Sequence, residues 1–130
     1  MNLNRRSLLA GVALGFLAVS GAQAANKLPF EAAAFEAARD SGKPVVLQVA
    51  ATWCGPCQKM KRTVSDLVGR PDFKDVMIFE ADYDADKEEL RRLNAYHVTT
   101  LVLYRNKTEV QRTVGETQVE VIEPFLRKAM

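Results

Sequence analysis

The chain of 130 residues contains only two cysteines and a single histidine. A structural zinc site usually takes four cysteine or histidine ligands, so this scarcity argues against a metal site. Internal repeats, linkers and low-complexity segments are also missing. The acidic run from Asp82 to Glu89 is expected to be a solvated loop and helix start rather than a metal loop. We therefore expect one globular domain without a bound metal.

Most of the chain lacks an excess of basic or of acidic residues. The net charge is +2, from 18 basic and 16 acidic residues. Arg5 and Arg6 account for this surplus, because residues 1–24 hold no other charged side chain. A neutral domain lacks the basic surface that binds nucleic acid or an acidic membrane. Its partners should therefore be selected by shape and chemistry.

No apolar run approaches the roughly 20 residues that a membrane-spanning helix needs. The first strongly apolar run extends only from Leu8 to Val19, between the arginine pair and Ala22-Gln23-Ala24. This layout is typical of a secretory signal peptide with an A-x-A cleavage site. We expect residues 1–24 to be removed and residues 25–130 to be exported, in bacteria to the periplasm. A retained anchor is the alternative, and the Sec and twin-arginine routes both remain open.

The remaining sequence alternates between helical and strand-like hydrophobic patterns. A buried strand that is apolar on both faces is expected in the middle, with parallel crossovers around it and an antiparallel hairpin near the end. The sequence thus predicts an α/β fold with its site at the carboxyl end of the central strand. The expected helices cover Phe30–Asp40, the segment from the cysteines to Val68, Asp86–Ala95 and the stretch around Val119–Leu126; the expected strands cover Val45–Ala50, Val76–Ala81, Leu101–Tyr104 and Glu109–Val114.

The two cysteines are separated by Gly55 and Pro56. A structural disulfide is a poor explanation, because so short a ring contributes only about 2 kcal/mol by the chain-entropy relation. Cys54 lies where a strand gives way to a helix, so unpaired amides and the helix dipole favour its thiolate. Cys57 lies one turn later and can attack a mixed disulfide on Cys54. This spacing predicts Cys54 as the nucleophile and Cys57 as the resolving cysteine.

The segment Ala51-Thr52-Trp53-Cys54-Gly55-Pro56-Cys57 resembles the active site of the thioredoxin family. The resemblance continues weakly through residues 100–106 to Gly115, and Lys43-Pro44-Val45-Val46 is similar to the exported branch with Dsb-type reductase domains. It implies a thioredoxin fold, with a central mixed β-sheet flanked by helices. It also implies exchange with protein thiols and disulfides by the cysteine pair itself, without a cofactor.

The resemblance further implies a monomer that receives electrons from a membrane or periplasmic donor. A Gly-Pro pair between the cysteines favours a reductant, since thioredoxin has a potential of about −270 mV against about −120 mV for the strong Dsb oxidase. Two alternatives stay open. One is a disulfide-introducing oxidase, and the other is a thioredoxin-like binding or chaperone module without activity.

Two positions depart from the family pattern in the proton-handling part of the site. Thioredoxins keep a buried Asp six residues before the first cysteine, and Gln48 takes that place here. The Lys that usually partners this Asp aligns with Glu80. Glu80 is therefore a candidate proton acceptor or relay for Cys57, and the alternative is an exposed acid at a strand end.

A third departure concerns the substrate loop. Thioredoxins carry a cis-proline facing the disulfide, but this chain has no proline between Pro71 and Pro124, and Thr99 takes the position. A non-proline cis bond costs about 3 to 4 kcal/mol, so the Val98–Thr99 bond is expected to be trans. Trp53 is expected to shield the disulfide and offer a substrate surface, and His97 to be structural.

Overall fold

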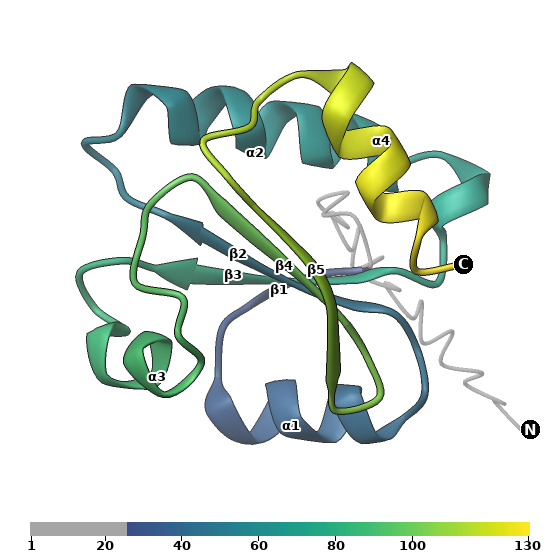
Figure 1. Cartoon of the computed structure of the whole chain (residues 1–130), viewed down its shortest axis with the longest axis horizontal. Helices are drawn as coiled ribbons and strands as arrows, with labels where there is room; N and C mark the ends of the chain where they lie inside the picture. Colours follow the sequence, from purple (N-terminus) through teal and green to yellow (C-terminus); the bar gives the residue numbers. More distant parts are fainter. Residues whose placement is uncertain (1–25) are drawn as a thin grey trace, which may run out of the picture.

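The computed structural model describes residues 26–130, which form a five-stranded sheet with helices on both faces (Figure 1). The predicted signal peptide lies outside the described residues. Ten elements follow one another: β1 (Lys27–Pro29), α1 (Ala32–Asp40), β2 (Val45–Ala50), α2 (Gly55–Val68), the short 3-10 helix η1 (Pro71–Phe73), β3 (Met77–Asp82), α3 (Lys87–Arg92), β4 (Thr100–Arg105), β5 (Thr108–Val114) and α4 (Val119–Arg127).

The strands lie in the order β1-β3-β2-β4-β5. β1 and β2 run parallel to β3, whereas β4 runs antiparallel to both β2 and β5. All six residues of β2 are buried, as a run with a single polar residue, Gln48, predicts for a strand covered on both faces. The predicted α/β class and mixed sheet are confirmed.

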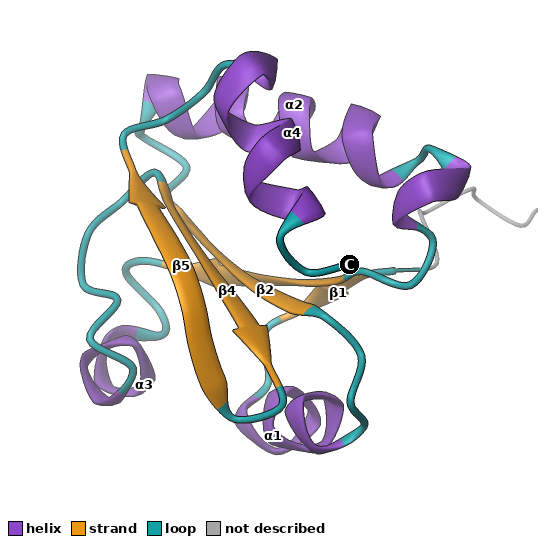
Figure 2. Cartoon of the chain, turned by 45° about the vertical axis from the view of Figure 1, so that its right-hand side comes forward, coloured by secondary structure: helices purple, strands orange, loops and turns teal. Residues whose placement is uncertain are grey.

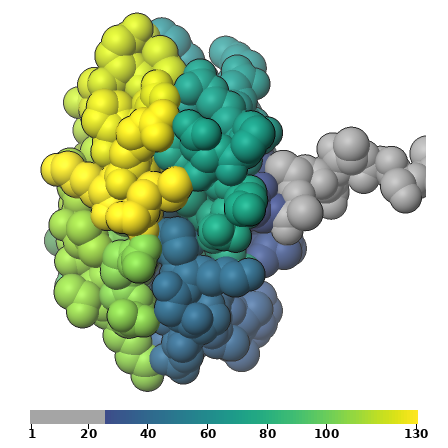
Figure 3. Space-filling view, turned by 90° about the vertical axis from the view of Figure 1, so that its right-hand side faces the viewer, coloured from purple at the N-terminus to yellow at the C-terminus, as the bar shows by residue number. Residues whose placement is uncertain are grey.

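Two apolar clusters fill the spaces above and below the sheet. One lies between the sheet and the pair α2 and α4 and includes both cysteines, and the other lies toward α1 and α3. Figure 2 shows the two helix pairs on opposite faces. In Figure 3 the yellow surface of α4 lies against the teal surface of the α2 and η1 region. Two ion pairs join these surfaces, Arg127 with Asp72 at 3.3 Å and Arg70 with Glu123 at 3.0 Å.

The structure adds β1 and η1 to the predicted elements and shortens one helix. β1 was not expected, because three residues ending in a proline give no periodic signal; its pairing with β3 supplies the stability. The third helix was predicted from Asp86 to Ala95 but spans only Lys87–Arg92. It stops there because Asn94 adopts a left-handed conformation, with φ of 52°.

Among residues 26–130, no helix is both long enough and apolar enough to cross a bilayer.

Candidate active site

The cysteine pair lies at the amino end of α2, where the chain leaves the carboxyl end of β2. Cys54 is the N-cap residue, with extended backbone, and its Sγ accepts the amide of Cys57 at 3.2 Å. Pro56 occupies the first turn, where its missing N–H costs no helical hydrogen bond. Strand, turn and helix thus aim the first sulfur at the unpaired amides of α2.

Cys54 and Cys57 are joined in a disulfide with a Cα separation of 5.3 Å. Cys57 is fully buried, whereas Cys54 remains 6% exposed. An incoming thiol or disulfide therefore reaches Cys54 first, and Cys57 lies behind it. This difference in access agrees with an attacking and a resolving role, which access and thiolate character together decide.

Trp53 lies on the surface beside the disulfide, with 64% of its area exposed. Its indole N–H donates to the carboxylate of Asp84 at 2.8 Å, and its ring packs edge-on against Tyr83 at a centroid distance of 6.1 Å. The indole is thus an oriented apolar surface for a partner. Sequence reasoning did not single out Asp84, which lies in the acidic run. The signal that could have pointed to it is the indole N–H of Trp53, a donor that needs a partner.

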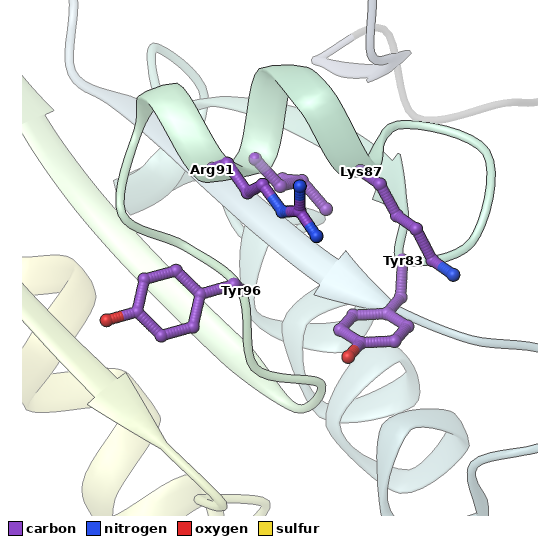
Figure 4. A pocket seen from close by; sticks show the side chains of 5 residues that line it. Tyr83, Lys87, Arg91 and Tyr96 are labelled. Atoms are coloured by element: carbon purple, nitrogen blue, oxygen red, sulfur yellow. The ribbon is translucent and has the colours of Figure 1, made fainter.

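A cleft of about 470 Å³ adjoins this surface on the α3 side. Its lining comprises Tyr83, Lys87, Leu90, Arg91 and Tyr96. Figure 4 shows Arg91 reaching over the space between the two tyrosine rings. Because Tyr83 belongs both to the cleft and to the contact with Trp53, the cleft adjoins the indole beside the disulfide.

Gln48 and Glu80 lie side by side on β2 and β3. The buried Gln48 amide donates to the Glu80 carboxylate at 3.3 Å, and Lys27 pairs with the same oxygen at 2.9 Å. Lys27 also donates to Ser65 of α2 at 2.6 Å. Sequence reasoning missed Lys27 because it belongs to β1. Among residues 26–130, no hydrogen bond joins Glu80 to Cys57.

The segment before β4 approaches the sulfurs from the other side. Val98 packs against the cluster that contains both cysteines, and the Val98–Thr99 bond is trans, as expected. Thr99 has a φ of 52°, which is unusual for a β-branched residue and costs on the order of 1–3 kcal/mol. Its Oγ1 lies 3.4 Å from Sγ of Cys54 and 3.2 Å from Sγ of Cys57.

His97 is exposed, and its ring lies against Tyr96 at a centroid distance of 5.1 Å. No group of three or more His, Cys, Asp or Glu side chains is arranged around a common point in residues 26–130. This arrangement offers the chemistry of the two sulfurs, and Thr99 is a polar side chain in contact with both of them.

Comparison with known proteins agrees with this geometry. The family model described as Thioredoxin matches residues 26–128. The chain belongs to the thioredoxin family. It is 33% identical over 88 residues to a thioredoxin H-type protein of Fagopyrum esculentum, covering 68% of this chain and 74% of the relative. It is 35% identical over 75 residues to a thioredoxin of Mycobacterium tuberculosis, covering 58% of this chain and 64% of the relative.

Solved thioredoxin structures show the same fold. The crystal structure of Trxlp from Edwardsiella tarda superposes with a TM-score of 0.74 at 36% identity, over 77% of this chain and 97% of that one. The thioredoxin NaTrxh of Nicotiana alata gives a TM-score of 0.70 at 24% identity, over 80% of this chain and 92% of that one, which supports the fold alone. The predicted thioredoxin fold is confirmed. With its cysteine pair in place, the chain is a thioredoxin-like thiol-disulfide oxidoreductase.

Proposed function

We propose that this thioredoxin reduces disulfides of client proteins after export, in bacteria in the periplasm. The observation that carries the proposal is the position of Cys54 as the N-cap of α2, with Cys57 buried one turn behind it. Residues 1–24 support the location by their signal-peptide pattern. A membrane or periplasmic dithiol donor regenerates the reduced pair.

The reaction runs in two exchanges. The Cys54 thiolate attacks one sulfur of the client disulfide, forms a mixed disulfide and expels the other client sulfur as a thiolate. Cys57 then loses its proton and attacks Cys54, which releases the second client thiolate and forms the Cys54–Cys57 disulfide. Two electrons pass from the protein to the client. Clients approach over Trp53 and the cleft beside α3.

Cysteine variants test the assignment. Cys54→Ser should abolish insulin reduction, because no exposed sulfur remains to attack. Cys57→Ser should accumulate mixed disulfides with a client, because the resolving sulfur is gone. Preferential alkylation of Cys57 over Cys54 in the reduced protein at mildly acidic pH would reverse the two roles.

A binding module without activity is set aside, because the chain belongs to the thioredoxin family and carries the cysteine pair. A disulfide-introducing oxidase is the second candidate, favoured by the hydroxyl that Thr99 holds against both sulfurs. The reduction potential against glutathione separates reductant from oxidase: a value near −270 mV supports a reductant, and one near −120 mV an oxidase.

A further inference from the structure

The hydroxyl of Thr99 occupies a position that no other side chain shares. Among residues 26–130, it is the only side-chain group that hydrogen-bonds to both sulfurs, at 3.4 Å from Cys54 and 3.2 Å from Cys57. Neither sulfur of a disulfide carries a proton, so in the oxidised protein the hydroxyl is the donor. Thr99 follows Cys54 by 45 positions in the sequence.

The surroundings of this hydroxyl are buried from solvent. Thr99 is 4% exposed, Cys54 is 6% exposed and Cys57 is fully buried. A hydrogen bond to a charged sulfur is stronger in such a low-dielectric site than on the surface. The contact is therefore well placed to influence the thiolate that reduction creates.

The backbone holds Thr99 in this place against its own preference. A positive φ is unfavourable for a β-branched side chain. The Thr99 carbonyl accepts the amide of Gly115 at 2.8 Å, and β4 begins at the next residue, paired with Val114 of β5. The hairpin thus fixes a conformation that turns the hydroxyl toward the sulfurs, and strain of this kind concentrates at functional sites.

We propose that Thr99 is a catalytic residue whose hydroxyl bridges the reduced pair, donating to the Cys54 thiolate while accepting from the Cys57 thiol. This rests on the proposed function, in which Cys54 is the nucleophile. The hydroxyl has one proton to donate and lone pairs to accept with, so it serves both sulfurs at once. Thr99 neither gains nor loses a proton in this state.

The hydroxyl bridge shifts the pKa of Cys54 in a definite direction. Donation to the thiolate stabilises the charged form and lowers the pKa of Cys54, and acceptance from the thiol keeps the proton on Cys57. Because the reduced pair is stabilised, the protein becomes more oxidising than it would be without the hydroxyl. The hydroxyl thereby assigns thiolate and thiol to the two cysteines in a chain whose Gln48 cannot accept a proton.

The test compares Thr99→Val with Thr99→Ser. Valine keeps the β-branch and its backbone preference but lacks the hydroxyl, whereas serine keeps the hydroxyl. Thiolate ultraviolet absorbance, titrated in the reduced proteins, should show the pKa of Cys54 raised by about one unit in Thr99→Val and little changed in Thr99→Ser. The matching tenfold change in the exchange equilibrium makes the potential of Thr99→Val about 30 mV more negative.

An unmoved Cys54 titration in folded Thr99→Val, or an equal shift in both variants, overturns the proposal. If Thr99→Val does not fold, Thr99→Ala replaces it, and the comparison with Thr99→Ser again isolates the hydroxyl. These titrations need no client and no turnover. A wild-type protein that fails to reduce insulin therefore defeats the proposed function but leaves the bridge to be judged by its own measurement.

Discussion

Gln48 and Glu80 show how a single exchanged residue alters the chemistry near the sulfurs. The buried amide of Gln48 cannot take a proton, and the neighbouring carboxylate of Glu80 is bound by Lys27 from β1. The carboxylate lies across the strand pair from the position where thioredoxins keep an acid. The resemblance to thioredoxins predicted this position for the carboxylate. The hydrogen bond from Gln48 and the ion pair with Lys27 are seen only in the structure.

Glu80→Gln tests whether this carboxylate relays the proton of Cys57. The variant should slow release of the mixed disulfide more than its formation, because only release requires deprotonation of Cys57. Stopped-flow measurement of the two steps with a model disulfide separates them. Lys27→Met is a control that disturbs the same ion pair but leaves the carboxylate. Equal release rates for Glu80→Gln and wild type would remove Glu80 from the mechanism.

At the scale of elements, α3 and the segment after it shape the surface beside the disulfide. Lys87 and Arg91 lie one turn apart on this helix and both line the cleft, whereas Arg92 lies outside it and pairs with Glu89 at 3.0 Å. The short length of α3 lets the chain turn at Asn94 and bring Tyr96 to the opposite wall of the cleft. The helix therefore contributes cations, and the loop contributes an aromatic wall.

Arg91→Glu should lower the rate of reduction of a disulfide peptide with an acidic flank, by about two- to fivefold relative to a basic one. An exposed ion pair of this kind contributes roughly 0.2–1 kcal/mol. Arg92→Glu is the matched control, with the same charge change on the same helix outside the cleft. The measurement is kcat/KM for the two peptides at low salt. Identical preferences in both variants would show that the cleft does not select clients.

At the scale of the whole molecule, the aromatic cluster toward α1 links stability to pH. The Tyr104 ring lies on β4 among buried side chains and under the guanidinium of Arg39, 4.7 Å from its centroid. Burial, and then the charge of Glu109, raise the pKa of the Tyr104 phenol above its ordinary value. The folded protein therefore holds this proton more tightly than the unfolded chain does.

Stability should accordingly fall as the pH rises past about 10, the ordinary tyrosine pKa, and continue to fall through the higher pKa of folded Tyr104. Tyr104→Phe keeps the ring and should reduce this alkaline loss, measured by urea unfolding at about pH 9 and about pH 11. Tyr96→Phe, at an exposed ring, is the control and should lose stability as the wild type does. An alkaline loss of the same size in Tyr104→Phe would contradict the prediction.

The sequence by itself determined the features that depend on near neighbours. Strand, cap and helix are specified within a dozen or so residues by the mostly apolar run of β2, the Gly-Pro turn and the three-residue spacing of Cys54 and Cys57, because periodicity and capping are local properties. The resemblance at the same residues identified the fold. These parts of the site could be predicted without coordinates.

Only the tertiary structure decided which distant groups meet at the sulfurs. β1 exists because β3 offers it a free edge, and through it Lys27 reaches Glu80. The anchor of Trp53 at Asp84 and the contact of Thr99 with both cysteines join segments at least thirty-one residues apart. Sequence periodicity says which face a side chain takes but not its partner across the fold, because the partner is fixed by how the sheet and loops pack together.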